Sequence, residues 1–168
     1  MAQLRRKDKA LDNETTLQVL QSALYGMLAT CGPEGPYAVP VNYVFSGGCI
    51  YFHCARKGQK LDNIALEERA CFTVVEEGAS LREDLSCNYR CAMAFGTVKE
   101  VTEKEEILRA LRLLCEKYYG GCTLALEGGT VVTEVPHFVD HTAFSAVRVF
   151  CLSCTRITGK GWHGPQEG

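Results

Sequence analysis

Residues 25–53 read YGMLATCGPEGPYAVPVNYVFSGGCIYFH, which is three apolar stretches separated by two short glycine-rich segments. The apolar stretches are Tyr25–Cys31, Tyr37–Phe45 and Cys49–His53, and they contain many of the β-branched and aromatic residues that strands favour. Glycine supplies the positive backbone angles that hairpin turns require. We therefore predict three consecutive antiparallel strands joined by turns at 32–36 and 46–48.

Three helices are predicted around this unit. Asp12-Asn13-Glu14 offers N-cap residues, and the apolar residues that follow recur every three or four positions, which predicts an amphipathic helix at about 14–24. Similar spacing predicts a short helix over 58–67 and a longer one over 103–119, which Gly120-Gly121 would end.

Further strands are predicted at 70–75, at 89–101 with a bend or bulge at Gly96, and at 144–156. The segment 124–141 is ambiguous and is interpreted as partly strand and partly helix. No strand–helix–strand alternation occurs, so we expect a mainly β fold, an antiparallel barrel or sheet with peripheral helices. At 168 residues we expect a single domain over 1–168, with a flexible N-terminus (1–12) and C-terminal tail (161–168).

The composition excludes several classes of function. The formal net charge is -2, which disfavours a general nucleic-acid or anionic-membrane partner, since such proteins carry a marked basic excess. Apolar stretches stop well short of the ~20 residues that a membrane-spanning helix needs. Most of the ten cysteines lie inside apolar runs, where a reduced cysteine acts as a small hydrophobe, so we expect a reducing, cytoplasmic location.

Residues 53–60, His-Cys-Ala-Arg-Lys-Gly-Gln-Lys, hold three permanent positive charges and no carboxylate. They lie where a predicted strand ends and a predicted helix begins, and a helix N-terminus presents unpaired amide groups and a partial positive charge to an anion. Gly58 leaves room for close approach of a phosphate, and Lys60 would reach the same oxygens. The alternative interpretation is a solvated basic loop with no ligand.

This segment has a sequence context that resembles a known family. Three stretches carry the resemblance: Gly26–Thr30, then Gly35-x-x-Ala-Val-Pro-Val-Asn-Tyr43, then Ile50–His53 continued by x-Ala55-x-x-Gly58-x-Lys60-Leu-Asp-Asn63. Together they are similar to the FMN-binding split β-barrel proteins, the pyridoxamine 5′-phosphate oxidase-like family. The similarity continues through 89–98 and 157–160, covers about 14–160, and is nearest to the nitroimidazole-resistance branch. It implies an antiparallel split β-barrel of the FMN-binding type.

By that resemblance FMN is the expected cofactor, and its sites would lie at the interface of a homodimer. The isoalloxazine ring would lie beside Pro40, Val41, Asn42 and Tyr43, and the phosphate would be held by His53, Cys54, Ala55 and Lys60. Residues that would complete the site, partly from the second subunit, are Tyr89, Arg90, Lys160 and Trp162. His53 is also a candidate catalytic proton donor, since the ordinary pKa of histidine is ~6.5, and the alternative is a purely structural or phosphate-binding role.

No metal site is expected. Cys151-x-x-Cys154 is one pair without a second, and Cys87 and Cys91 are separated from His137 and His141 by far more than the ~12–15 residues of a zinc finger. Alternation along strands accounts for these cysteines.

The function expected from the resemblance is that of an FMN-dependent oxidoreductase acting on a small molecule, such as a nitro-aromatic compound, with a nicotinamide or other electron donor. Oxidation of vitamin B6 is not expected, because the sequence reads Gly-Trp-His-Gly-Pro-Gln-Glu-Gly over 161–168, where authentic pyridoxamine phosphate oxidases are arginine-rich. The alternative is a non-catalytic protein that binds or stores flavin or haem.

Overall fold

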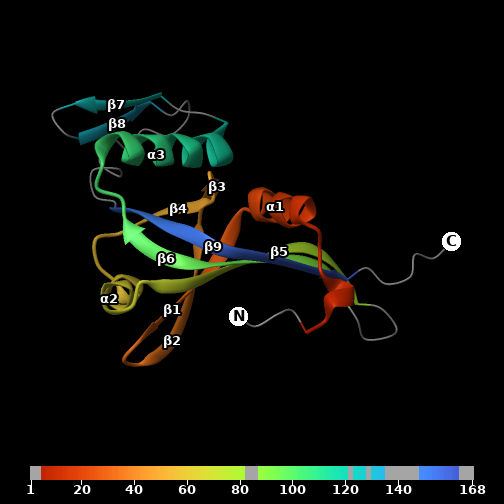
Figure 1. Ribbon diagram of the computed structural model, residues 1–168. Helices are drawn as coiled ribbons and strands as arrows, with labels where there is room; N and C mark the ends of the chain where they lie inside the picture. The colour runs from red at the N-terminus through yellow and green to blue at the C-terminus, as the bar shows by residue number, and fades with distance from the viewer. Residues whose placement is uncertain (1–4, 82–86, 121–122, 128–129, 135–147, 163–168) are drawn as a thin grey trace.

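One antiparallel sheet is the frame of the molecule, and the computed structural model describes residues 5–81, 87–120, 123–127, 130–134 and 148–162. The strands of this sheet are β1 Tyr25–Gly32, β2 Gly35–Asn42, β3 Val44–Ser46, β4 Cys49–Cys54, β5 Arg69–Leu81, β6 Cys87–Glu100 and β9 Arg148–Trp162. Their order across the sheet is β2-β1-β5-β6-β9-β4-β3 (Figure 1). A separate two-stranded hairpin, β7 Thr123–Glu127 with β8 Thr130–Glu134, lies beyond the third helix (Figure 1).

The three predicted strands of 25–53 are present, with one difference in the middle. The expected strand 37–45 is divided at Tyr43 into β2, which pairs with β1, and β3, which pairs with β4. These two strands are the opposite edges of the sheet. The chain therefore crosses from one edge to the other within a single residue, which curls the sheet into a barrel that is split between β2 and β3.

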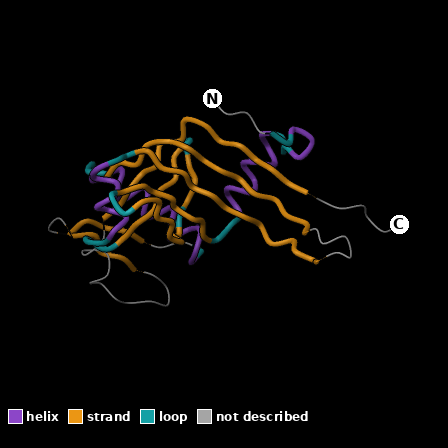
Figure 2. The backbone as a smooth tube through the Cα atoms, turned by 90° about the horizontal axis from the view of Figure 1, so that it is seen from below, coloured by secondary structure: helices purple, strands orange, loops and turns teal. Residues whose placement is uncertain are grey.

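The long strands extend further than the sequence predicts. The strand expected at 70–75 is β5, which continues to Leu81 because it stays paired with β6 (Figure 2). Of the strand expected at 144–156, residues 144–147 lie outside the described residues, and the rest is β9, which continues to Trp162. The irregularity expected at Gly96 is confirmed as a register shift, and the extra residue is Thr155 on β9. A Cβ on Gly96 would lie 1.9 Å from the Ser153 carbonyl oxygen, so glycine is required by close approach of the two strands.

The helices agree with the sequence to within two residues at each end. They are α1 Asn13–Ser22, α2 Gln59–Leu66 and α3 Lys104–Tyr119. Asp12 caps α1 by accepting from the Thr15 N–H at 2.7 Å, and Gly120, in the left-handed conformation, ends α3. None of the helices described here is long and apolar enough to cross a bilayer. Of the ambiguous segment 124–141, the described part is strand, and 135–147 lies outside the described residues.

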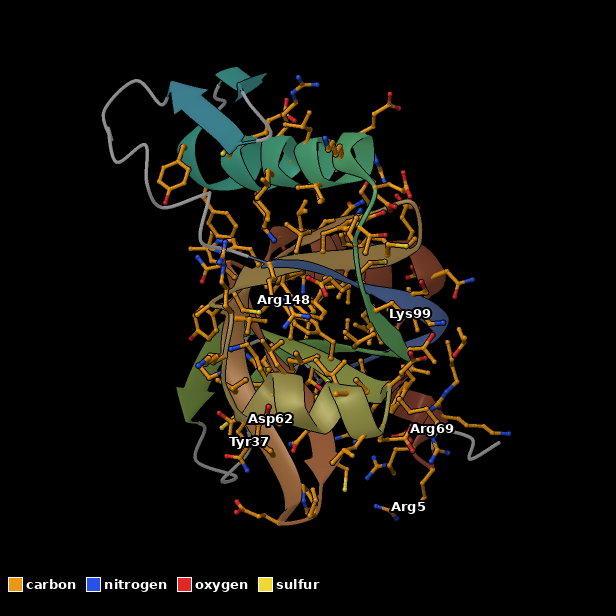
Figure 3. All side chains as sticks on the ribbon, turned by 90° about the vertical axis from the view of Figure 1, so that its left-hand side faces the viewer. Arg5, Tyr37, Asp62, Arg69, Lys99 and Arg148 are labelled. Carbon is orange, nitrogen blue, oxygen red and sulfur yellow. The ribbon has the colours of Figure 1, made fainter. Side chains whose placement is uncertain are left out.

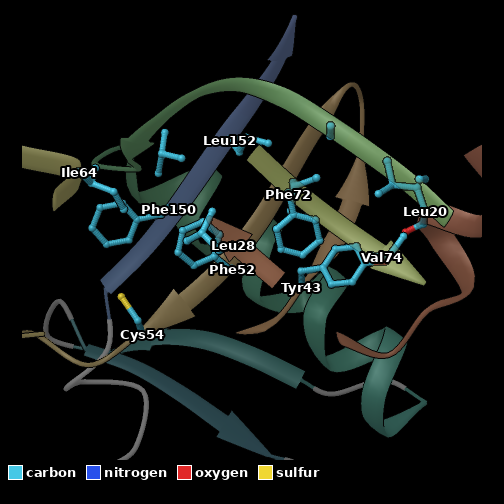
Figure 4. Close-up of a cluster of buried hydrophobic side chains, with 14 of the residues drawn as sticks. Leu20, Leu28, Tyr43, Phe52, Cys54, Ile64, Phe72, Val74, Phe150 and Leu152 are labelled. Atoms are coloured by element: carbon cyan, nitrogen blue, oxygen red, sulfur yellow. The ribbon is translucent and has the colours of Figure 1, made fainter. Parts of the chain in front are cut away.

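Two clusters of buried side chains form the core. The inner cluster fills the barrel with aromatic and aliphatic side chains from five strands and from α1 and α2 (Figure 4). Within it the Tyr43 and Phe72 rings have centroids 4.6 Å apart. The outer cluster packs α3, through Leu111 and Leu114, on the outside of β3, β4 and β9. Helices therefore cover only part of the outer face of the sheet among the described residues.

Candidate functional site

The basic segment 53–60 lies where the sequence predicts it, between the end of β4 and the first turn of α2. Arg56, Lys57 and Gly58 are exposed, and Lys60 is half-buried. Gly58 has φ +145°, a backbone conformation that other residues rarely adopt. This conformation turns the chain into α2 and places both basic side chains of the loop beside the N-terminus of the helix.

The N-terminus of α2 is open to a ligand. The amides of Leu61 and Asp62 are used within the chain, since they donate to the Gly58 carbonyl at 2.8 and 3.3 Å. The amides of Gln59 and Lys60 precede the first intrahelical bond, and no side chain caps the helix. Uncapped amides and the helix dipole favour an anion at this position. The donor set, amides with a lysine in the first turn, therefore fits a phosphate group.

His53 and Cys54 lie next to this helix end but point to opposite sides of β4. His53 is exposed, yet partial loss of water lowers its pKa, so its imidazole is mainly neutral at pH 7. Cys54 is buried in the inner cluster, which raises the pKa of its thiol, while the nearby Lys60 lowers it. Only the backbone of Cys54 remains for a ligand at the outer surface.

Residues 40–43, predicted to border a flavin ring, alternate between the two faces of the sheet. Pro40 and Asn42 are exposed on β2, whereas Val41 packs against the inner cluster. Tyr43 is fully buried, and its hydroxyl donates to the Leu20 carbonyl at 2.5 Å. A ligand on the outer face would therefore meet Pro40 and Asn42, while Val41 and Tyr43 shape the strand from within.

Tyr43 is fixed by two side chains of α3 that the sequence does not single out. The Tyr118 hydroxyl accepts from the Tyr43 N–H at 2.8 Å and lies 2.9 Å from its carbonyl oxygen. Lys117 lies 3.8 Å above the Tyr43 ring and donates to the Ala23 carbonyl at 2.7 Å. Burial lowers the pKa of Lys117 to about 8. The end of α3 thus secures the point where the chain crosses between the edges of the barrel.

An apolar patch lies on the outer face of the sheet beside Pro40 and Asn42. Tyr25 and Met27 of β1 are 61% and 38% exposed, and Val75 of β5 is 59% exposed. Asn42 pairs with Tyr25 and Pro40 with Met27, so the candidate ring-binding residues belong to the same surface. We call Tyr25, Met27 and Val75 the outer patch.

The remaining candidates lie at the far end of the sheet from His53. Tyr89 pairs with Trp162, Arg90 with Gly161, and Cys91 with Lys160. His53 pairs with Val149, eleven residues before Lys160 on β9, which is about 36 Å at ~3.3 Å per residue. One flavin cannot contact both ends of β9 in a single chain, so a site that uses both sets requires a second copy.

Two details distinguish these far-end residues. Arg90 forms an ion pair with Glu76 at 2.5 Å, so its charge already has a partner. The indole N–H of Trp162 is buried and has no hydrogen-bond partner within the described chain, and Lys9 lies 4.1 Å over the ring. A buried donor without a partner is rare in native proteins.

A buried polar contact connects the two halves of the candidate site. Asn63 of α2 is 3% exposed, and its Nδ2 donates to the Thr30 hydroxyl at 3.2 Å. This contact joins the helix that begins at the basic segment to the β1–β2 hairpin that presents Pro40 and Asn42. In the sequence Asn63 is visible only as part of the family motif, because 33 residues separate it from Thr30.

The cysteines are free thiols throughout the described part of the chain. In the same residues no group of three or more histidine, cysteine, aspartate or glutamate side chains is placed to hold a metal ion. His137 and His141 lie outside the described residues.

The fold and the site together define a split β-barrel with an open helix N-terminus at one end. The family model described as pyridoxamine 5′-phosphate oxidase matches residues 12–160, and the chain belongs to that family. No curated protein matches the sequence significantly. The split barrel expected from the sequence is confirmed.

Solved structures with the same fold are distant in sequence. A protein of Bacteroides thetaiotaomicron described as a 5-nitroimidazole antibiotic resistance protein is 21% identical, with a TM-score of 0.68 over 90% of this chain and 86% of that one. The flavocytochrome Anf3 of Azotobacter vinelandii is 19% identical, with a TM-score of 0.74 over 97% of this chain and 73% of that one. An FAD-binding protein of Mesorhizobium loti is 17% identical, with a TM-score of 0.65 over 92% and 98%.

Proposed function

We propose that the protein binds FMN and is an FMN-dependent oxidoreductase of a small molecule. The observation that carries the proposal is the uncapped N-terminus of α2, with Lys60 in its first turn. Asn63 of the same helix bonds the β1–β2 hairpin, which exposes Pro40 and Asn42. Membership in a family with flavin-binding relatives supports a flavin ligand.

Each part of the flavin has a counterpart in these residues. The phosphate would bind the amides of α2 and Lys60, and the ring would lie on the outer face against Pro40, with the Asn42 amide at its pyrimidine edge. The bound flavin supplies electron transfer. His53, exposed beside the phosphate, would donate a hydrogen bond to it, and its protonated form would deliver a proton to a substrate, a step that its lowered pKa favours only as the pH falls.

We propose that the site is completed in a homodimer. The outer patch exposes large apolar side chains next to the candidate ring site, and such patches are typical of protein interfaces. A second copy on this patch would bring its own Lys160 and Trp162 towards the flavin.

For the substrate we propose a small nitro-aromatic or quinone-like compound, with a nicotinamide as the electron donor, because the chain resembles the nitroimidazole-resistance proteins. We propose a cytoplasmic location, supported by the free thiols. The second candidate function is non-catalytic binding of flavin or haem, which similarity to a flavocytochrome favours. Turnover of a nitroimidazole by the flavin-loaded protein with a supplied reductant would support the enzyme, and a haem absorption band without turnover would support the alternative.

The phosphate position is tested by comparing FMN with riboflavin, which lacks the phosphate. Lys60→Gln should weaken FMN about 10-fold or more, since a hydrogen bond to a charged group contributes about 1.5–3 kcal/mol, and should leave riboflavin unchanged. Lys104→Gln at the start of α3 is the matched control and should change neither affinity. Undiminished FMN affinity of Lys60→Gln would contradict the placement.

A further inference from the structure

A hollow lies on the side of α2 away from the β1–β2 hairpin. It has a volume of about 410 Å³ and is bordered by α2, the end of β6 and the start of β9. This volume is within the ~300–1,000 Å³ typical of ligand pockets. In Figure 3, Arg148 lies above α2 and Asp62 on the helix itself. None of the residues expected to hold FMN lines this hollow.

The floor of the hollow is apolar and the strand side carries a flat cation. Val98 and Phe150, exposed by 0% and 2%, form part of the floor. The Arg148 guanidinium lies 5.2 Å from the centroid of the Phe150 ring, and its Nε donates to Glu100 at 2.7 Å. The Arg148 side chain is 36% exposed and lines the hollow, so part of the guanidinium is open to it. A planar aromatic group stacks well on an exposed guanidinium.

The rim adds charges of both signs. Arg56 and Lys57 line the hollow from the loop before α2, where cations suit a phosphate. Asp62 lines it from α2, and a carboxylate there would accept hydrogen bonds from ribose hydroxyls, whereas Glu68 is paired with Lys99 at 3.6 Å. An exposed guanidinium, two cations on the loop and a carboxylate on the helix match an aromatic base, a phosphate and a sugar.

We propose that this hollow binds the adenosine 5′-phosphate part of a dinucleotide, with FAD as the favoured source. The inference rests on the proposed flavin site, because Arg56 and Lys57 belong to the same loop that would hold the flavin phosphate. A second phosphate joined to the first would emerge beside these two side chains, and the adenosine would then enter the hollow. The chain thus accepts FMN but holds FAD more tightly.

Filling the hollow tests the proposal. Ala65 is exposed on α2 and lines the hollow, whereas its neighbour Leu66, also exposed, does not. The wild-type protein should bind FAD at least 10-fold more tightly than FMN. Ala65→Phe should abolish that preference with FMN affinity unchanged, and Leu66→Phe should change neither value. Circular dichroism of each variant establishes that it is folded.

Titrations with NADH and with 5′-AMP distinguish adenylate that belongs to FAD from adenylate of a separate nucleotide. They also distinguish failure of the hollow as a site from failure of the proposed FMN site. If the protein loaded with FMN binds NADH or 5′-AMP, and Ala65→Phe prevents this, the hollow takes adenylate from a separate nucleotide, which supports the site. Equal affinities for FAD and FMN, together with no binding of NADH or 5′-AMP, would overturn it while leaving the FMN site intact. An FAD preference that survives Ala65→Phe would overturn it too. Failure to bind any flavin would instead contradict the proposed function.

Discussion

Gly32 of β1 lies directly against the Asn63 carboxamide of α2, and a Cβ on Gly32 would be only 2.0 Å from Asn63 Oδ1. The same carboxamide donates to the Thr30 hydroxyl, and that hydroxyl lies 3.5 Å from the Tyr37 carbonyl oxygen of β2. The position of α2 on the barrel is therefore set by a contact that tolerates no side chain at residue 32. The spacing between the phosphate and ring halves of the proposed site depends on it.

Gly32→Ala should separate α2 from the hairpin. We expect the free energy of unfolding to fall by about 1–3 kcal/mol, which is typical of overpacking. We also expect FMN to bind more weakly, by more than the smaller folded fraction accounts for. Urea unfolding and FMN titration measure the two effects. Pro33→Ala, at an exposed position in the same turn, is the control. An unchanged stability of Gly32→Ala would show that Asn63 moves aside without cost.

A charge in the outer patch should separate the proposed dimer. Val75→Lys places an ammonium group at a position that is 59% exposed in the single chain, so a monomer should accept it, whereas an interface would bury an unpaired charge. Light scattering after gel filtration should report twice the chain mass for the wild type and one chain mass for the variant. Tyr119→Lys on α3, where the side chain is 63% exposed, should leave the mass unchanged. A wild-type monomer, or a dimer of Val75→Lys, would contradict the outer patch as the interface.

Stability should fall at alkaline pH because of buried thiols. Burial raises the pKa of Cys151 to about 12 and that of Cys154 to about 11. Unfolded thiols ionise near ~8.5, so above that pH the unfolded chain binds fewer protons than the folded chain, and the free energy of unfolding decreases with rising pH. The contribution is complete below pH ~8.5 and is lost as the pH rises towards 11–12.

Urea unfolding between pH 7.5 and 10.5, under reducing conditions, measures this dependence. Cys151→Ala should be less stable at pH 7.5 but should show a shallower decline than the wild type. Cys31→Ala, which removes an exposed thiol, should retain the wild-type slope. Identical slopes for Cys151→Ala and the wild type would show that the buried thiol does not carry the pH dependence.

Much of the fold could be predicted from local signals in the sequence. Asp12 and Gly120 mark helix ends through hydrogen bonding and backbone angle, and Gly96 marks the irregular pairing of β6 with β9, all of which are local properties. The partition of 37–45 at Tyr43 could not be predicted, because the run is continuously strand-like. Its division depends on the curvature of the whole sheet and on Tyr118, which is far away in the sequence.

The candidate site was predictable to a smaller extent. The basic segment 53–60 is contiguous, so its charge and its place before a helix are visible in the sequence. The contact of Gly32 with Asn63 and the lining of the hollow beside α2 by Arg148 depend on long-range packing, and no spacing rule indicates them. Tyr43 and Cys54 are buried because of the alternation of side chains between the two faces of a strand. The predicted strand boundaries do not determine which of the two faces is the inner one.

The most direct test of the central claim, that the N-terminus of α2 captures the phosphate of a flavin, is an equilibrium titration of the folded, flavin-free protein with FMN. Quenching of flavin fluorescence should saturate at one FMN per chain, and added inorganic phosphate should weaken the binding by competition. A protein that is folded by circular dichroism but leaves FMN fluorescence unchanged at excess protein would contradict the account.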